Sequence, residues 1–169
     1  MKALFEELRP GSKDWVLAKK IDPRRLPAHI AVIMDGNGRW AKRRNLPRVA
    51  GHKAGAEAVR ATVEACARLG IRFLTLYAFS AENWKRPQDE VSTLWRLLHV
   101  YLRKELSNLH KHNVRLTAIG RLDALPAAAR EELEAAIQAT QANDGLQVNL
   151  ALNYGGRNEL VDAFNEILK

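Results

Sequence analysis

The sequence predicts an α/β fold in which a mostly parallel central sheet carries helices on both faces. Two observations support this prediction. Four short apolar runs bounded by turn residues alternate with segments whose apolar residues recur at helical spacing. Such alternation is typical of parallel sheets connected through helices. Three of the runs are also followed by polar or glycine-rich loops, DGNGR, SAENW and NYGGR, at one predicted edge of the sheet. Open α/β sheets bind their ligands at that edge.

The first strand is predicted at residues 30–34, a β-branched run between two turn residues. It ends at Asp35, and a helix is expected to begin at Trp40. Asp35 is a hard oxygen ligand of the kind that Mg²⁺ takes together with substrate phosphates. The glycines of the intervening loop allow a ligand to approach the backbone, and its arginine suits phosphate oxygens. The loop consists of Gly36, Asn37, Gly38 and Arg39.

The alternative for this loop is a hairpin turn, because Asp-Gly and Asn-Gly are common there. A hairpin requires a second strand directly afterwards, and the basic run 42–44 is a poor strand. The next segment carries Arg48 and His52 ahead of a helix predicted from about Lys53 to Gly70. His52 could contact an anion there, although an ordinary surface histidine is the alternative.

The second strand is predicted at residues 71–79, and a polar cluster follows it. Its members could supply hydrogen bonds, a proton acceptor and a phosphate ligand; they are Ser80, Ala81, Glu82, Asn83, Trp84 and Arg86. The alternative is ordinary loop polarity with a helix cap. If the first two strands are neighbours, both clusters face one cleft.

The remaining elements complete the alternation. A helix with a wide apolar stripe is expected at 89–110, where it either packs in the core or walls an apolar cavity. Strands are expected at 114–119 and 146–152, with a helix at 126–140 between them and a last helix ending at Lys169. Residues 1–26 are predicted to form an N-terminal extension with a short helix around Leu4, Phe5 and Leu8. Residues 27–169 are predicted to form a single α/β domain.

Composition and charge limit the classes of function that the chain can have. The chain of 169 residues has one cysteine, Cys66, and therefore no internal disulfide. It has no apolar run long enough for a membrane span and no signal-peptide core, so a cytoplasmic protein is expected. Residues 1–60 hold 14 Lys/Arg and 6 Asp/Glu, which accounts for the whole net charge of +8. This field attracts phosphates, nucleic acid or an anionic membrane surface. No nucleic-acid-binding motif accompanies it.

Three segments together resemble the cis-prenyltransferases, and in particular undecaprenyl diphosphate synthase, also called isoprenyl transferase. They are HIAVIMDGNGRWAKRRNLPRVAGHKAG, TLYAFSAENWKRP and NLALNYGGR. The resemblance runs from about residue 27 to the C-terminus. It implies the fold of that family and a Mg²⁺-dependent condensation of isopentenyl diphosphate with an allylic diphosphate to a polyprenyl diphosphate. It also implies a homodimer, with peripheral membrane contact through the lipid product and no nucleic-acid partner.

The resemblance assigns roles to single residues. Asp35 would hold Mg²⁺ and assist departure of the allylic diphosphate, and Asn83 would act near the proton removed from isopentenyl diphosphate. The allylic diphosphate would bind at Gly36, Asn37, Gly38, Arg39, Trp40, Arg48 and His52. Ser80, Ala81, Glu82, Trp84 and Arg86 would also contribute to substrate binding. The helix from Asp89 and the strand at Leu146 would line a tunnel for the growing chain.

The chain departs from the family pattern at its C-terminal side. The family carries a later motif with arginine and serine for isopentenyl diphosphate and a further acidic Mg²⁺ ligand, and the sequence up to Lys169 lacks both. The domain is therefore expected to be incomplete, with part of the dimer contact missing. Three alternatives stay open: an inactive fragment, a non-catalytic accessory subunit that binds diphosphate, and a basic nucleic-acid binder.

Overall fold

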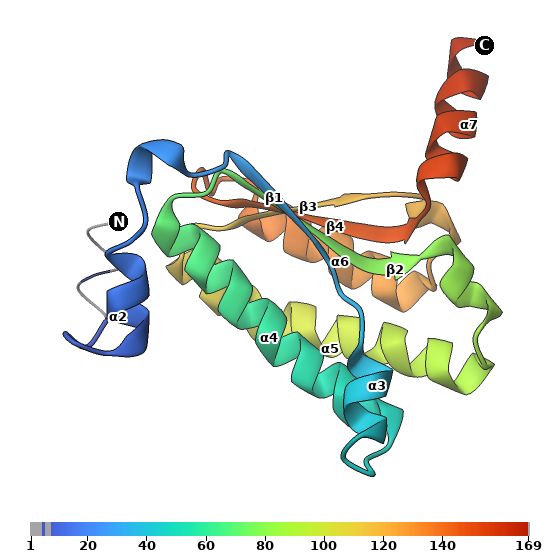
Figure 1. The fold of residues 1–169 in the computed structure, drawn as a ribbon. Helices are drawn as coiled ribbons and strands as arrows, with labels where there is room; N and C mark the ends of the chain where they lie inside the picture. Colours follow the sequence, from blue (N-terminus) through green and yellow to red (C-terminus); the bar gives the residue numbers. More distant parts are fainter. Residues whose placement is uncertain (1–4, 6–7, 169) are drawn as a thin grey trace.

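The computed structural model describes residue 5 and residues 8–168, and it contains one parallel sheet of four strands (Figure 1). The strands are β1 (His29–Ile33), β2 (Phe73–Ser80), β3 (Arg115–Ile119) and β4 (Gln147–Tyr154). They lie in the order β1-β2-β4-β3, and each neighbouring pair is parallel. The predicted parallel sheet is thus confirmed. Because β1 and β2 are neighbours, the loops that follow them leave the sheet side by side.

The helices follow the predicted alternation. They are α2 (Lys13–Ala18), α3 (Asn37–Lys42), α4 (Arg48–Leu69), α5 (Gln88–Lys111), α6 (Ala127–Thr140) and α7 (Gly156–Ile167), with a short 3₁₀ helix η2 (Ala81–Lys85) after β2. Helix α4 begins five residues earlier than the sequence suggested. Pro47 occupies its N-cap position, and Gly51 is tolerated inside the helix because α3 packs closely there. Gly70, at φ 78°, ends α4 as expected.

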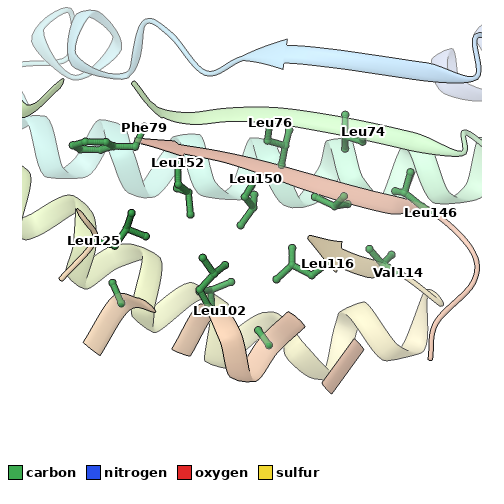
Figure 2. Packing of buried hydrophobic residues seen from close by; sticks show 14 of the residues in the cluster. Leu74, Leu76, Phe79, Leu102, Val114, Leu116, Leu125, Leu146, Leu150 and Leu152 are labelled. Carbon is green, nitrogen blue, oxygen red and sulfur yellow. The ribbon is translucent and has the colours of Figure 1, made fainter. Parts of the chain in front are cut away.

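The hydrophobic core lies between the sheet and one layer of helices. Helices α4, α5 and α6 lie on the same side of the sheet (Figure 1). Leu150 and Leu152 of β4 point from the sheet toward Leu102 of α5 (Figure 2). Other buried members of this core are Leu74, Leu76, Leu116, Leu133 and Val148. The core fixes the strand ends against α4 and α5.

The expectation of helices on both faces needs correction for the described residues. The face opposite α4–α6 carries polar side chains that alternate with the buried leucines. The Thr117 hydroxyl donates to Asn149 Oδ1, and Asn149 Nδ2 donates to Thr75 Oγ1 at 3.3 Å. These hydrogen bonds satisfy the polar groups without a covering helix. The polar residues stand singly within apolar stretches of the sequence, so the sequence analysis did not predict a polar face. Helix α7 projects away from the sheet and leaves this face uncovered (Figure 1).

The N-terminal region was predicted only in part. Of the short helix expected around Leu4, Phe5 and Leu8, Leu4 lies outside the described residues. Helix α2 was not predicted. It starts at a Ser12 cap, whose Oγ accepts the Trp15 N–H at 3.2 Å.

Candidate active site

Asp35 stands two residues beyond the end of β1, at the entrance to α3. Its Oδ1 accepts the Gly36 N–H at 2.5 Å, and its Oδ2 accepts from Arg39 Nη2 at 2.7 Å. The Gly36 N–H and then the Arg39 guanidinium lower the pKa of Asp35, so its carboxylate is ionised at neutral pH. The side chain is 74% exposed, which leaves its oxygens open to further ligands.

The turn after Asp35 depends on glycine at several positions. Gly36 adopts φ 91°, a conformation that side chains disfavour. Helix α3 then rests directly on α4. A Cβ at Gly51 would lie 2.0 Å from the Asn37 carbonyl oxygen, and one at Gly55 would lie 2.6 Å from Asn37 Oδ1. The two α4 glycines therefore set the position of the Gly36–Arg39 turn.

The second polar cluster is fixed by η2, directly after β2. Ser80 and Asn83 form a capping box, in which Asn83 Oδ1 accepts the Ser80 N–H at 3.1 Å. The Ser80 hydroxyl lowers the pKa of the exposed Glu82 carboxyl. Trp84 donates through Nε1 to Asn153 Oδ1 at 2.8 Å and packs against Trp95, with ring centroids 5.6 Å apart. Trp84 thus ties η2 to β4.

Glu90 contacts two arginines and one histidine of the predicted site and was missed by the sequence analysis. Its Oε2 accepts from Arg48 Nη1 at 2.6 Å and its Oε1 from Arg86 Nη1 at 3.0 Å, while His52 Nε2 lies 3.7 Å from Oε1. The Glu90 side chain is only 11% exposed. The i,i+4 spacing from Arg86 to Glu90 was the available signal. The partnership with Arg48, 42 residues away along the chain, left no local signal.

Burial and charge set the protonation states around Glu90. Burial raises the pKa of Glu90, but its hydrogen bonds and charge contacts with Arg48 and Arg86 outweigh this, so the pKa lies below its usual value. Burial lowers the pKa of His52 more than the Glu90 charge raises it. His52 Nε2 is buried and has no hydrogen-bond partner among the described residues. The imidazole is therefore neutral at pH 7 and has an unused ring nitrogen.

Both polar clusters open onto one cavity of about 590 Å³ between the sheet, α4 and α5. Nine of the fourteen residues predicted for the site line it: Asp35, Gly36, Asn37, Gly38, Arg39, Arg48, His52, Asn83 and Arg86. Beyond this polar rim the lining is mainly apolar and includes Val59, Val63, Leu94, Leu98, Leu102 and Leu109. The arrangement suits a molecule with an anionic head and a long hydrocarbon tail.

The other five predicted residues lie beside the cavity without lining it. Ser80, Ala81, Glu82 and Trp84 belong to β2 and η2. Trp40 lines a neighbouring pocket of about 420 Å³ that also borders Asp35 and Arg39. The Arg44 guanidinium lies over the Trp40 ring, 4.2 Å from its centroid. For these residues a role in substrate binding stays a prediction.

The site offers a metal ion few protein ligands. Among the described residues, no group of three or more His, Cys, Asp or Glu side chains could hold a metal. Asp35 alone presents an exposed, ionised carboxylate at the rim. One carboxylate fits Mg²⁺, which commonly takes its other ligands from water and substrate phosphates. Within the described part of the chain, no helix is both long and apolar enough to cross a membrane.

The family model described as "Putative undecaprenyl diphosphate synthase" matches residues 33–169. An isoprenyl transferase of Heliobacterium mobile is 53% identical over 165 residues, which cover 98% of this chain and 64% of the relative. The farnesyl-diphosphate-specific ditrans,polycis-undecaprenyl-diphosphate synthase of Lactiplantibacillus plantarum is 50% identical, covering 99% of this chain and 63% of the relative.

A solved structure supports the same similarity. Lavandulyl diphosphate synthase from Lavandula x intermedia, crystallised with dimethylallyl diphosphate, matches with a TM-score of 0.82 and 33% identity. The match covers 84% of this chain and 61% of the plant enzyme. The chain thus spans about three fifths of the length of the relatives it resembles.

Proposed function

The chain belongs to the undecaprenyl diphosphate synthase family of prenyltransferases, and we propose that it condenses isopentenyl diphosphate with an allylic diphosphate to a polyprenyl diphosphate. The observation that carries this proposal is the continuity of the cavity. A rim with the carboxylates of Asp35 and Glu90 and three arginines leads directly into the apolar interior of the same cavity of about 590 Å³. A prenyl diphosphate has the matching shape and polarity.

The allylic substrate is proposed to bind with its diphosphate at the rim and its tail inward. The N–H groups of residues 37–39 precede the first helical hydrogen bond of α3, which runs from Trp40 N to Gly36 O. They can therefore donate to phosphate oxygens. Arg39 and Arg48 flank them with guanidinium groups, the side chains best suited to phosphate. The tail would lie between Leu94 and Leu98 of α5 and Val59 of α4.

The reaction requires the allylic diphosphate to depart while C4 of isopentenyl diphosphate bonds to C1 of the allylic group and a proton leaves C2. Positive charge at the rim would stabilise the departing anion. Asp35 would hold Mg²⁺, which when bound neutralises part of the diphosphate charge. Asn83 would orient isopentenyl diphosphate through Nδ2, because its Oδ1 already accepts the Ser80 N–H. We also propose that the protein acts in the cytoplasm as a homodimer with peripheral membrane contact.

Turnover by the purified 169-residue chain tests the proposal. Radiolabelled isopentenyl diphosphate is incubated with farnesyl diphosphate and Mg²⁺, and products are extracted into butanol. We expect polyprenyl diphosphate from the wild type and a loss of at least about 100-fold in Asp35→Ala, because one misplaced or missing catalytic contact has effects of that size. Asp89→Ala, which removes a nearby exposed carboxylate outside the cavity, is the matched control. Absence of any turnover by the wild type would contradict the proposal.

A further inference from the structure

A basic turn, defined as residues 42–47, lies beside the cavity rim. Residues 36–56 contain six Lys/Arg and no Asp/Glu. Two of these cations belong to the site, since Arg39 pairs with Asp35 and Arg48 with Glu90. Among the described residues, no ion pair includes Lys42, Arg43, Arg44 or Lys53. Positive charge therefore accumulates here without neutralisation.

The basic turn is held in one conformation by its own backbone. Asn45 adopts φ 55°, the left-handed conformation that ends many helices. The Leu46 N–H donates to the Ala41 carbonyl at 3.0 Å, and the Asn45 N–H donates to the Lys42 carbonyl at 3.1 Å. Together these bonds form a Schellman motif at the end of α3. The cations are thus presented on a rigid support, and binding to a surface would order little additional backbone.

The same turn exposes apolar side chains between its charges. All six of its residues are exposed, and Leu46 is exposed to 43%. Trp40, one turn earlier on α3, is exposed to 37% and stacks against the Arg44 guanidinium. A large aliphatic group and an indole beside several cations suit the interface of a membrane, where apolar atoms enter the acyl boundary and cations meet phosphate headgroups. A nucleic-acid surface offers no such apolar layer to Leu46.

We propose that the basic turn, together with Lys53, docks on an anionic phospholipid bilayer. This inference rests on the proposed function for its purpose, because a polyprenyl diphosphate is a lipid that must pass from the cavity into a bilayer. Arg39 lines the cavity and also the pocket that borders Arg43 and Arg44, so the basic turn adjoins the cavity mouth. Docking there brings the mouth of the cavity to the headgroup layer.

Vesicle sedimentation tests the inference without substrate or turnover. The wild type is mixed with vesicles of pure phosphatidylcholine or with vesicles that also contain phosphatidylglycerol. Each Lys or Arg near an anionic surface strengthens binding about fivefold, so the triple variant Lys42→Gln/Arg43→Gln/Lys53→Gln should bind anionic vesicles roughly 100-fold more weakly. The matched control is Lys104→Gln/Lys111→Gln/Arg115→Gln. It removes the same charge from exposed residues away from the basic turn and should bind nearly as the wild type.

Leu46→Ser separates insertion from charge attraction. Salt screens the cations, so the binding that remains at high salt depends on the apolar tip. We expect Leu46→Ser to lose most of that residual binding while keeping most of its binding at low salt. Equal weakening of both triple variants, or no wild-type binding to anionic vesicles, would overturn the inference. So would complete displacement of the vesicles by duplex DNA at equal phosphate concentration, which would assign the turn to nucleic acid.

The inference and the proposed function can fail separately. Vesicle binding that is lost selectively in the basic-turn variant supports the docking surface even if the chain turns over no substrate. Turnover without vesicle binding would uphold the prenyltransferase proposal and reject the docking surface.

Discussion

Gly51→Ala is expected to damage the site far more than it damages the fold. The new Cβ would lie 2.0 Å from the Asn37 carbonyl oxygen, whereas real Cβ contacts lie above 3.0 Å. The backbones of α3 and α4 must therefore separate by about 1 Å, because neither atom belongs to a flexible side chain. Asn37 opens the turn that is proposed to hold the diphosphate. A displacement of about 1 Å at a catalytic contact can cost roughly 100-fold in rate.

The effect on stability should be small by comparison. Overpacking costs about 1–3 kcal/mol, while alanine gains about 1 kcal/mol over glycine inside a helix. The net loss in free energy of unfolding is therefore about 0–2 kcal/mol, measurable by urea denaturation. Affinity for farnesyl diphosphate, measured by calorimetry, should fall at least about tenfold, and turnover about 100-fold. Gly156→Ala is the control, because its Cβ meets no atom within 4 Å. Wild-type affinity of the Gly51→Ala protein for farnesyl diphosphate would contradict this prediction.

Three further predictions concern single side chains. Glu90→Gln removes the charge shared by Arg48 and Arg86 and should lower stability by about 1–2 kcal/mol at pH 7. The pKa of Glu90 in the folded protein lies below its usual 4.5, so the stability that this carboxylate gives the wild type is lost as pH falls. The difference in free energy of unfolding between the wild type and Glu90→Gln, measured by urea denaturation, should therefore shrink below about pH 4.5. His52 is neutral when free, and a bound diphosphate should raise its pKa. Binding should therefore take up protons and tighten as pH falls from about 7.5 toward 6.5. Calorimetry in buffers of different ionisation heat would detect this uptake, and His52→Gln should abolish it. Trp84→Phe removes the hydrogen-bond donor to Oδ1 of Asn153, a residue that is only 6% exposed. The free energy of unfolding, measured by thermal denaturation, should therefore fall by about 1–3 kcal/mol. No loss of stability there would favour a direct substrate role for Trp84.

The sequence was sufficient to predict the strands and the edge at which the site forms. The apolar runs before Asp35 and Ser80 are local signals, and parallel pairing brings their ends together whatever the details of packing. Gly70 likewise marked the end of α4 through its left-handed conformation. These features depend on residues close together in the chain, so periodicity and turn chemistry reveal them.

Other features depend on contacts that no local pattern encodes. Glu90 contacts Arg48 and His52, but these partners lie 42 and 38 residues earlier in the chain. The need for glycine at position 51 follows from the close approach of the Asn37 backbone, a contact that the sequence alone does not reveal. The polar face of the sheet was missed since Thr75 and Asn149 each sit singly between apolar residues, and their hydrogen bonds cross from strand to strand.

A crystal structure with a non-reactive farnesyl diphosphate analogue would show where the diphosphate and the tail bind. We expect the diphosphate within hydrogen-bond distance of Arg39 and Arg48, with the farnesyl tail between α4 and α5 beside Leu98. A diphosphate bound away from the Asp35 turn, or a tail lying outside the cavity, would contradict it.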